Sequence, residues 1–313
     1  MHPERARARR EPTEGGREPT EGGQEPTEGG REPTEGGREP TEGGREPTEG
    51  RREAGGLGRD LSDVRRLISR TYRRDGTALL APERATDYGA REFAIDVRKA
   101  ANLLTHYGAG EGRRVAVAVG PKEPAAEDQP GWLGTAADPL YGILGGMVLG
   151  APVDPAPDPD GTVEAPVVIA PTAWLDRFEG GPGTTVLAYG GPPRDPAVVH
   201  FERERWSENP VEPPEPLEPG RTALRMDGSE WAHQDLVSVA AEVAATEDLA
   251  AATHVRVAAP VDSREALVTG VLAPLVAGTP IRPVPGAESL DGDRGVFAVA
   301  GDEGRRLTID DRP

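Results

Sequence analysis

Residues 140–154 read LYGILGGMVLGAPVD, an apolar helical stretch that stops at a glycine and leads into a short strand. Residues 268–282 read VTGVLAPLVAGTPIR and repeat this stretch at an offset of 128 residues without a gap. The identical pairs are Gly142/Gly270, Leu144/Leu272, Val148/Val276, Gly150/Gly278, Pro152/Pro280, Pro155/Pro283 and Pro157/Pro285. Glycine after a helix permits the left-handed conformation that ends it, so both stretches predict a helix, a stop and a strand. Two similar α/β lobes are therefore expected.

The segments around these two stretches alternate between helical and extended patterns. Helices are predicted over residues 60–73, 90–107, 136–149 and 230–245 and from Asp262 onward, and strands over 77–80, 85–88, 114–119, 151–153, 167–170, 185–189, 222–226, 254–259 and 280–284. Such alternation favours parallel sheets covered by helices, joined by right-handed crossovers. The predicted fold class is α/β, with two pseudo-symmetric parallel-sheet subdomains and flanking helices.

A repeat tail precedes this folded part. Residues 11–51 are six tandem copies of the unit EPTEGGR, with one Gln for Arg and a last copy that lacks one Gly. The unit contains no apolar residue to bury, so the tail is predicted to be disordered, and a passive repeat expansion is favoured over an interaction tail. The predicted organisation is a tail over 1–56, a first subdomain over 57–208, a Pro-rich connector over 209–220 and a second subdomain over 221–313.

Composition excludes several classes of function. The chain has 36 Lys and Arg against 54 Asp and Glu, a formal charge of −18, which disfavours nucleic acid as a partner. The absence of cysteine excludes disulfides, thiolate zinc sites and thiol nucleophiles. Acidic residues throughout and only two lysines, Lys99 and Lys122, indicate a salt-adapted surface, a GC-rich genome, or both. No apolar run is long enough for a membrane span, and the cytoplasm is the expected location.

The polar residues alone predict no catalytic centre and no metal site. The five histidines lack the HxH and HExxH spacings that gather metal ligands. Ser229 and His233 lie four residues apart, but no GxSxG elbow surrounds the serine, whose predicted role is to cap the helix that follows.

Several segments resemble the opening of the adenylate-forming acyl-CoA synthetases, members of the AMP-dependent synthetase/ligase superfamily. They are ATDY at 85–88, ANLL at 101–104, GAGEG at 108–112, RVAVA at 114–118 and the stretch at 140–154. In the second half, LAPLVAG at 272–278 is similar to a further family segment, and His233 and Leu236 lie where the family has its THRNL helix. The resemblance covers roughly residues 60–290 and implies the amino-terminal part of such an enzyme, with two pseudo-symmetric sheets.

The sequence departs from this family where the family binds ATP. Its members make an acyl adenylate and hold the triphosphate in a loop of the form TSGTTGxPKG, between a strand and the helix that carries the histidine. Here the resemblance makes Asp227, Gly228 and Ser229 the remnant of that cofactor-binding loop, and Glu230 follows them. Two carboxylates at this place would repel phosphates. An aromatic-His pair of the family is replaced at 261–264, no lysine follows Lys122, and the carboxy-terminal catalytic domain is expected to be missing.

These departures favour a degenerate, non-catalytic relative that binds a ligand or has a regulatory role, without a catalytic residue, a metal or an assigned cofactor. An intact paralogue is then the expected partner. One alternative is half of a split AMP-forming acyl-CoA ligase, which would use ATP, Mg²⁺ and CoA together with a complementary ligase half. A second alternative is a structural or assembly subunit without a ligand.

Overall fold

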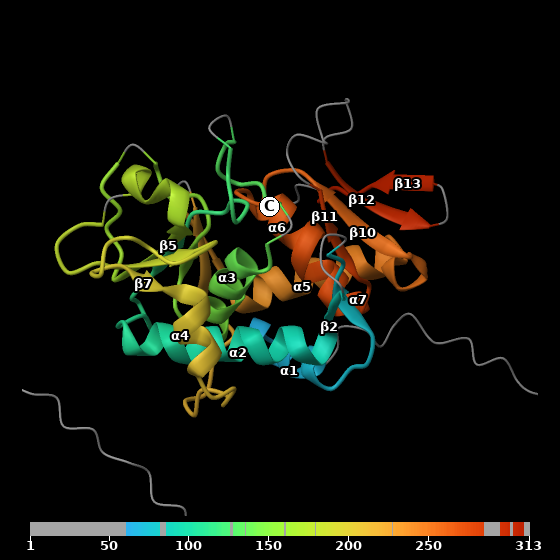
Figure 1. Cartoon of the computed structure of the whole chain (residues 1–313). Helices are drawn as coiled ribbons and strands as arrows, with labels where there is room; N and C mark the ends of the chain where they lie inside the picture. The colour runs from blue at the N-terminus through green and yellow to red at the C-terminus, as the bar shows by residue number, and fades with distance from the viewer. Residues whose placement is uncertain are drawn as a thin grey trace, which may run out of the picture. The chain divides into compact units, whose positions relative to one another are not determined.

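The computed structural model describes residues 61–81, 86–125, 128–134, 136–159, 161–178, 180–226, 228–284, 295–300 and 303–309. The repeat tail predicted over residues 1–56 lies outside them. The described residues all belong to one unit of the chain, which spans Arg52–Pro313. This unit is an α/β fold with two mixed sheets flanked by helices (Figure 1), which confirms the predicted fold class.

The first sheet has seven strands in the order β7-β6-β5-β3-β4-β8-β9. All neighbours pair in parallel except β8 and β9, which form an antiparallel hairpin. The strands are β3 Val115–Val117, β4 Val153–Asp154, β5 Val167–Pro171, β6 Thr185–Tyr189, β7 Val199–His200, β8 Thr222–Met226 and β9 Ser229–Ala232. Parallel neighbours require crossover connections, which are usually helices, so helices are expected on the faces of this sheet.

The central strand β3 is buried on both faces, and its side chains alternate between two apolar clusters. Val115 and Val117 belong to the main hydrophobic core. Ala116 belongs to a smaller cluster with Trp174 and Phe178 on the opposite face. The near-continuous run of apolar residues in this strand is typical of a parallel strand covered on both sides.

The second sheet has six strands in the order β13-β12-β10-β11-β1-β2. Only the β10–β11 and β11–β1 pairs are parallel, whereas β12, β13 and β2 are antiparallel to their neighbours. The strands are β1 Thr77–Leu79, β2 Tyr88–Gly89, β10 His254–Ala258, β11 Ile281–Pro283, β12 Gly295–Ala300 and β13 Glu303–Arg306. The sheet is therefore mixed and not parallel throughout. The antiparallel hairpin of β12 and β13 forms one edge, and β2, antiparallel to β1, forms the other.

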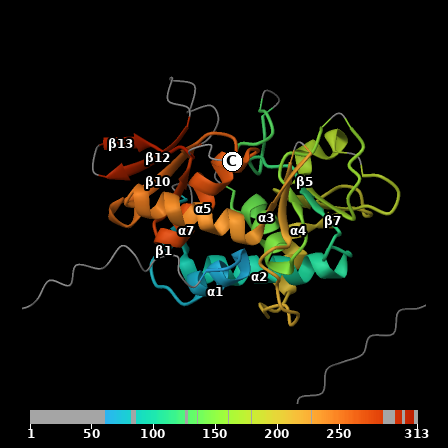
Figure 2. The same ribbon diagram turned by 180° about the vertical axis from the view of Figure 1, so that it is seen from behind.

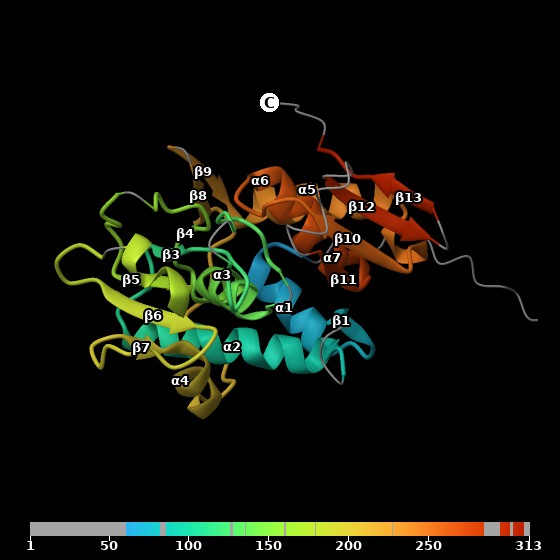
Figure 3. The ribbon, with the colours of Figure 1, turned by 45° about the horizontal axis from the view of Figure 1, so that its top comes forward.

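Each sheet contains strands that precede the Pro-rich connector in sequence and strands that follow it. Leu79 of β1 pairs with Ile281 of β11, so an early strand joins the sheet formed by late ones. Val153 of β4 pairs with Leu224 of β8, and Figure 3 shows β8 and β9 beside β4. Each sheet therefore contains strands from before and after residues 209–220. The domain boundary predicted at these residues stays a prediction.

The internal repeat has the predicted local structure. Helix α3, Asp138–Leu149, ends at Gly150 with φ 88°, and helix α7, Ala273–Ala277, ends at Gly278 with φ 84°. In each case a parallel strand, β4 or β11, follows directly. The second copy differs in that α6, Arg264–Leu267, passes through a π-helical turn at Val268–Leu272 before α7.

The matched glycines inside these helices let each helix approach its sheet closely. A Cβ atom at Gly142 would lie 2.8 Å from the Ile169 side chain of β5. A Cβ atom at Gly270 would lie 3.1 Å from the Val257 side chain of β10. Both distances are shorter than an unstrained carbon–carbon contact, so a side chain at either place would displace the neighbouring side chain of the sheet.

Helices that cover the two sheets also contact one another. Figures 1 and 3 show α3 and α5 between the two sheets, and Figure 2 shows α1 and α2 side by side. Helix α1 contacts α2, α3, α5 and α7, and thus helices of both sheets. None of the described helices is long and apolar enough to cross a membrane. The bounds are α1 Val64–Tyr72, α2 Ala90–His106, α4 Phe201–Ser207 and α5 His233–Thr246, with 3₁₀ turns at Thr172–Arg177 and Leu249–Ala251.

Candidate functional site

Gly228 and Ser229 of the phosphate-loop remnant lie in the β8–β9 hairpin, in which Met226 pairs with Ser229. Asp227 lies outside the described residues. Gly228 has φ 76°, a left-handed conformation that glycine adopts without strain. An Asp-Gly pair between two extended segments is a strong hairpin signal, and the sequence carries it.

This hairpin corrects the predicted start of the following helix. Ser229 lies in β9 and does not cap α5, which begins at His233. The first backbone N–H groups of α5 are satisfied by carbonyl groups instead. The N–H of His233 donates to the Arg221 carbonyl at 3.0 Å, and that of Gln234 donates to the Pro219 carbonyl at 2.9 Å. Pairing along the hairpin therefore overrides the capping preference of serine.

The side chains beside the turn are engaged with one another. Glu230 accepts a hydrogen bond from the Thr222 hydroxyl at 2.9 Å and another from the Arg225 guanidinium, with which it also forms an ion pair. The hydrogen bonds from Thr222 and then from Arg225 lower the pKa of Glu230. The hairpin therefore presents an ionised carboxylate next to the turn, and its one arginine already has a partner.

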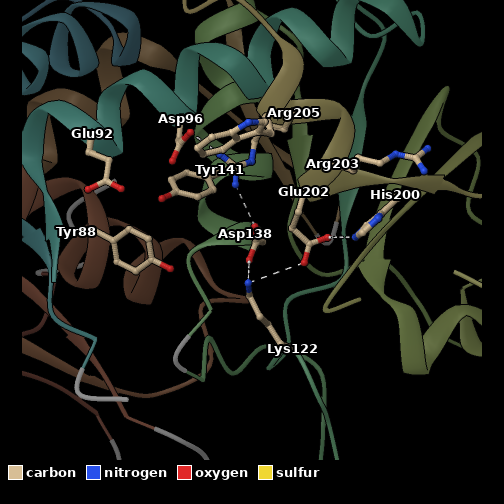
Figure 4. A pocket seen from close by; sticks show the side chains of 11 residues that line it. Tyr88, Glu92, Asp96, Lys122, Asp138, Tyr141, His200, Glu202, Arg203 and Arg205 are labelled. Atoms are coloured by element: carbon tan, nitrogen blue, oxygen red, sulfur yellow. Dashed lines mark hydrogen bonds and ion pairs between the residues drawn. The ribbon is translucent and has the colours of Figure 1, made fainter. Parts of the chain in front are cut away.

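A second feature, which the sequence analysis missed, is a cavity of about 620 Å³ at the carboxyl ends of strands of the seven-stranded sheet (Figure 4). Lys122 follows β3, His200 ends β7, and Glu202 lies in α4 directly after β7. This edge of an open α/β sheet is the usual place for a ligand-binding crevice. The lining residues are Tyr88, Glu92, Asp96, Lys122, Asp138, Tyr141, His200, Glu202, Arg203, Arg205 and Trp206, and we call this cavity the polar pocket.

A continuous series of ion pairs crosses the polar pocket. Its nitrogen–oxygen distances are 3.3 Å for His200–Glu202, 3.9 Å for Lys122–Glu202, 3.0 Å for Lys122–Asp138, 3.5 Å for Arg205–Asp138 and 2.6 Å for Arg205–Asp96. Acidic and basic groups alternate along it, the His200–Glu202 contact being an ion pair only when His200 is protonated, and we call these six residues the ion-pair chain. It links α2, α3 and α4 to the loop after β3, so the pocket is held by charge as well as by packing.

The buried part of the ion-pair chain is centred on Arg205. The Asp138 side chain is only 3% exposed, and the Arg205 guanidinium lies 4.4 Å from the centre of the Tyr141 ring. Such stacking suits a planar guanidinium and leaves its edge free to meet carboxylates. Each charge here is buried together with an opposite charge, as a low-dielectric interior requires.

The protonation states at the pocket follow from burial and neighbouring charge. Burial lowers the pKa of Lys122, but the charge and hydrogen bond of Asp138 and the charge of Glu202 outweigh it, so that the pKa is raised. Burial and then the charge of Asp96 raise the pKa of Tyr141 well above its ordinary value. Lys122 therefore stays a cation and Tyr141 a neutral phenol over the physiological pH range.

Among the uncharged polar groups that line the pocket, the Tyr141 hydroxyl lacks a hydrogen-bond partner within the described part of the chain. The residue is 1% exposed, and it lines the pocket. Figure 4 shows its hydroxyl on the side where Tyr88, Glu92 and Asp96 lie. A buried hydroxyl without a partner is costly, and the described residues do not offset this cost.

Across the described ranges, no three His, Asp or Glu side chains are grouped as ligands for a metal ion. Asp138 and Glu202 each face Lys122, which would compete with a metal ion for their oxygens. The pocket lining offers hydrogen-bonding groups and charged groups that are already paired with one another.

Sequence reasoning missed the polar pocket because its residues come from four separate stretches of the chain, at 88–96, 122, 138–141 and 200–206. One signal was available, since Lys122 is one of two lysines and directly follows a buried strand. Asp96 and Glu92 were indistinguishable from an ordinary solvated helix face, and Arg205 lies in a short helix, α4, that was not predicted.

No protein-family model matches the chain, and no curated protein is significantly similar to it in sequence. Solved structures are similar in fold. The anthranilate CoA ligase AuaEII in complex with anthranoyl-AMP has a TM-score of 0.56 at 14% identity, covering 72% of this chain and 45% of that one. NpsA-ThdA from Klebsiella oxytoca, an artificially fused adenylation–PCP di-domain of a nonribosomal peptide synthetase, has a TM-score of 0.53 at 16% identity, covering 72% and 40%.

The amino-terminal domain of FACL13 from Mycobacterium tuberculosis has a TM-score of 0.53 at 18% identity, covering 71% of this chain and 57% of that one. The chain thus spans about half of the length of these structures. These likenesses confirm the family resemblance of the sequence at the level of fold. Over about 72% of its length, the chain is structurally similar to the amino-terminal domain of the adenylate-forming ligases.

Proposed function

We propose that the protein is a non-catalytic relative of the adenylate-forming ligases, which acts by binding a small ligand and has a regulatory role. The observation that carries this proposal is the β8–β9 hairpin, in which Met226 pairs with Ser229. A triphosphate-binding loop holds phosphate through several converging backbone N–H groups and hydroxyls and a lysine. The remnant assigned to Asp227, Gly228 and Ser229 has one glycine and one hydroxyl at this place.

Electrostatics support the same proposal. The ionised Glu230 lies beside the turn, and its partner Arg225 is the nearest cation along the hairpin. No lysine occurs in the chain after Lys122. A triphosphate placed at this turn would meet a carboxylate without the point charge that could offset it. ATP, Mg²⁺ and CoA are accordingly not cofactors of this chain in our proposal.

The polar pocket supports a binding role. It combines a volume of about 620 Å³ with fixed charges and a buried hydroxyl that has no hydrogen-bond partner in the described part of the chain. Ligand sites commonly pair a preformed cavity with a few oriented polar groups. An intact ligase of the same superfamily is the partner that we propose for the regulatory role, since the two proteins would share this fold.

The purified full chain in molar KCl is expected to give no ATP–pyrophosphate exchange above background with short- and medium-chain carboxylic acids. The physical reason is that the hairpin offers too few donors for the triphosphate. An intact adenylate-forming ligase in the same buffer is the positive control. Exchange by this chain alone would contradict the proposal. Exchange only after a complementary ligase half is added would also contradict it and identify a split enzyme.

A further inference from the structure

We propose that the polar pocket binds an organic amine, whose ammonium group lies between Glu92 and the hydroxyl of Tyr141. This inference deepens the proposed binding function and rests on it, because it names the ligand class. It starts from the buried Tyr141 hydroxyl, which has no hydrogen-bond partner among the described residues and lines the pocket. A phenol oxygen accepts a hydrogen bond from an ammonium N–H, so an amine would satisfy it.

The charges around this hydroxyl favour a cation. Glu92 lines the pocket and has no ion-pair partner in the described ranges, and Asp96 lies on the same side in Figure 4. Arg203, a lining cation, is paired with Glu204 at 2.7 Å. The other two lining cations, those of the ion-pair chain, are each shared between two carboxylates. Glu92, Asp96, Asp138 and Glu202 outnumber these three cations by one, so the lining carries one negative charge in excess while His200 is neutral, which disfavours an anionic ligand.

The aromatic residues of the pocket fit the same ligand class. Tyr88 lies edge-on to Tyr141, with ring centres 6.4 Å apart, so two aromatic rings line this side of the pocket, and the Tyr141 ring carries Arg205 on one face. Ammonium groups are stabilised by carboxylates and by the faces of aromatic rings. Trp206, another lining residue, is 76% exposed and offers an apolar surface for the remainder of the molecule. An amine with an apolar or aromatic body therefore suits the pocket better than a bare inorganic cation.

The test uses 2-phenylethylamine as the probe, with 2-phenylethanol and 3-phenylpropionate as its neutral and anionic analogues. Calorimetric titration into the full chain is expected to give saturable binding of the amine below about 10 mM, and at least about tenfold weaker binding of both analogues. Equal binding of the amine and the alcohol, tighter binding of the acid, or no saturable amine binding would each overturn the proposal.

Two variants locate the amine in the pocket. Glu92→Gln and Tyr141→Phe are each expected to weaken amine binding about tenfold, because each removes one polar partner of the ammonium group. Glu242→Gln is the control, since it removes an exposed carboxylate of α5 that does not line the pocket. Glu92 is exposed, so its variant should fold. Unchanged affinity in Glu92→Gln would contradict the site. Amine binding is measured without ATP, so a negative result would overturn the amine site and leave the non-catalytic proposal, which ATP–pyrophosphate exchange tests, untouched.

Discussion

Replacing Arg205 by alanine is expected to lower the free energy of unfolding by about 3–5 kcal/mol. The guanidinium lies 2.6 Å from Asp96 and 3.5 Å from Asp138, and its own side chain is only 9% exposed. Its removal leaves the Asp96 side chain, which is only 16% exposed, without an ion-pair partner among the described residues. It also leaves Asp138 with Lys122 alone and removes the cation stacked on Tyr141. An uncompensated buried charge costs far more than the loss of a surface ion pair.

Urea unfolding followed by circular dichroism measures this effect. Arg203→Ala is the matched control on the same helix, because Arg203 is exposed and pairs only with its neighbour Glu204 in the described structure. Its free energy of unfolding is expected to change by less than about 1 kcal/mol. If Arg205→Ala were no more destabilising than Arg203→Ala, the ion-pair chain would not hold α2, α3 and α4 together as described.

Acidification from pH 7 to about pH 4 is expected to remove about 3 kcal/mol of stability through His233 alone. The residue is 0% exposed, and neither ring nitrogen has a hydrogen-bond partner among the described residues. Burial lowers its pKa from 6.5 to about 4, opposed by the charge of Asp63 and assisted by Arg65 and Arg221. The unfolded chain binds a proton near pH 6.5 and the folded one near pH 4, so stability falls as pH drops through this window.

The pH dependence of unfolding in His233→Leu isolates this contribution from that of the carboxylates. The variant should retain its stability better than the parent chain between pH 6.5 and pH 4, because leucine fills the site without a group to protonate. His106→Gln is the control, since the His106 side chain is 66% exposed. Parallel stability curves for His233→Leu and the parent chain would show that His233 is not buried in its neutral form.

The repeat between residues 140–154 and 268–282 allowed the helix-stop-strand units to be predicted from sequence, and the structure has both. Local signals sufficed there, because a helix that ends at glycine needs no distant partner. The placement of β1 in the six-stranded sheet and of β8 in the seven-stranded sheet could not be predicted in this way. It depends on pairings such as Leu79 with Ile281, which join residues far apart in the chain.

The candidate sites show the same difference. The shortened loop around Gly228 could be predicted from the sequence. The predicted helix cap at Ser229 was wrong, because the Asp-Gly pair before it is typical of a hairpin, which the structure has. The polar pocket was not visible, because charged residues such as Asp96 and Arg205 have the same local pattern whether they face solvent or each other. Only the tertiary structure shows that these charges are paired.

Calorimetric titration of MgATP into the full chain tests the central claim most directly. The account predicts no saturable heat up to about 5 mM nucleotide, which corresponds to a binding free energy weaker than about −3 kcal/mol. An intact adenylate-forming ligase, titrated in the same salt, checks that the buffer permits binding. A dissociation constant in the micromolar range for this chain, weakened by substitution of Ser229 in the β8–β9 hairpin, would contradict the account.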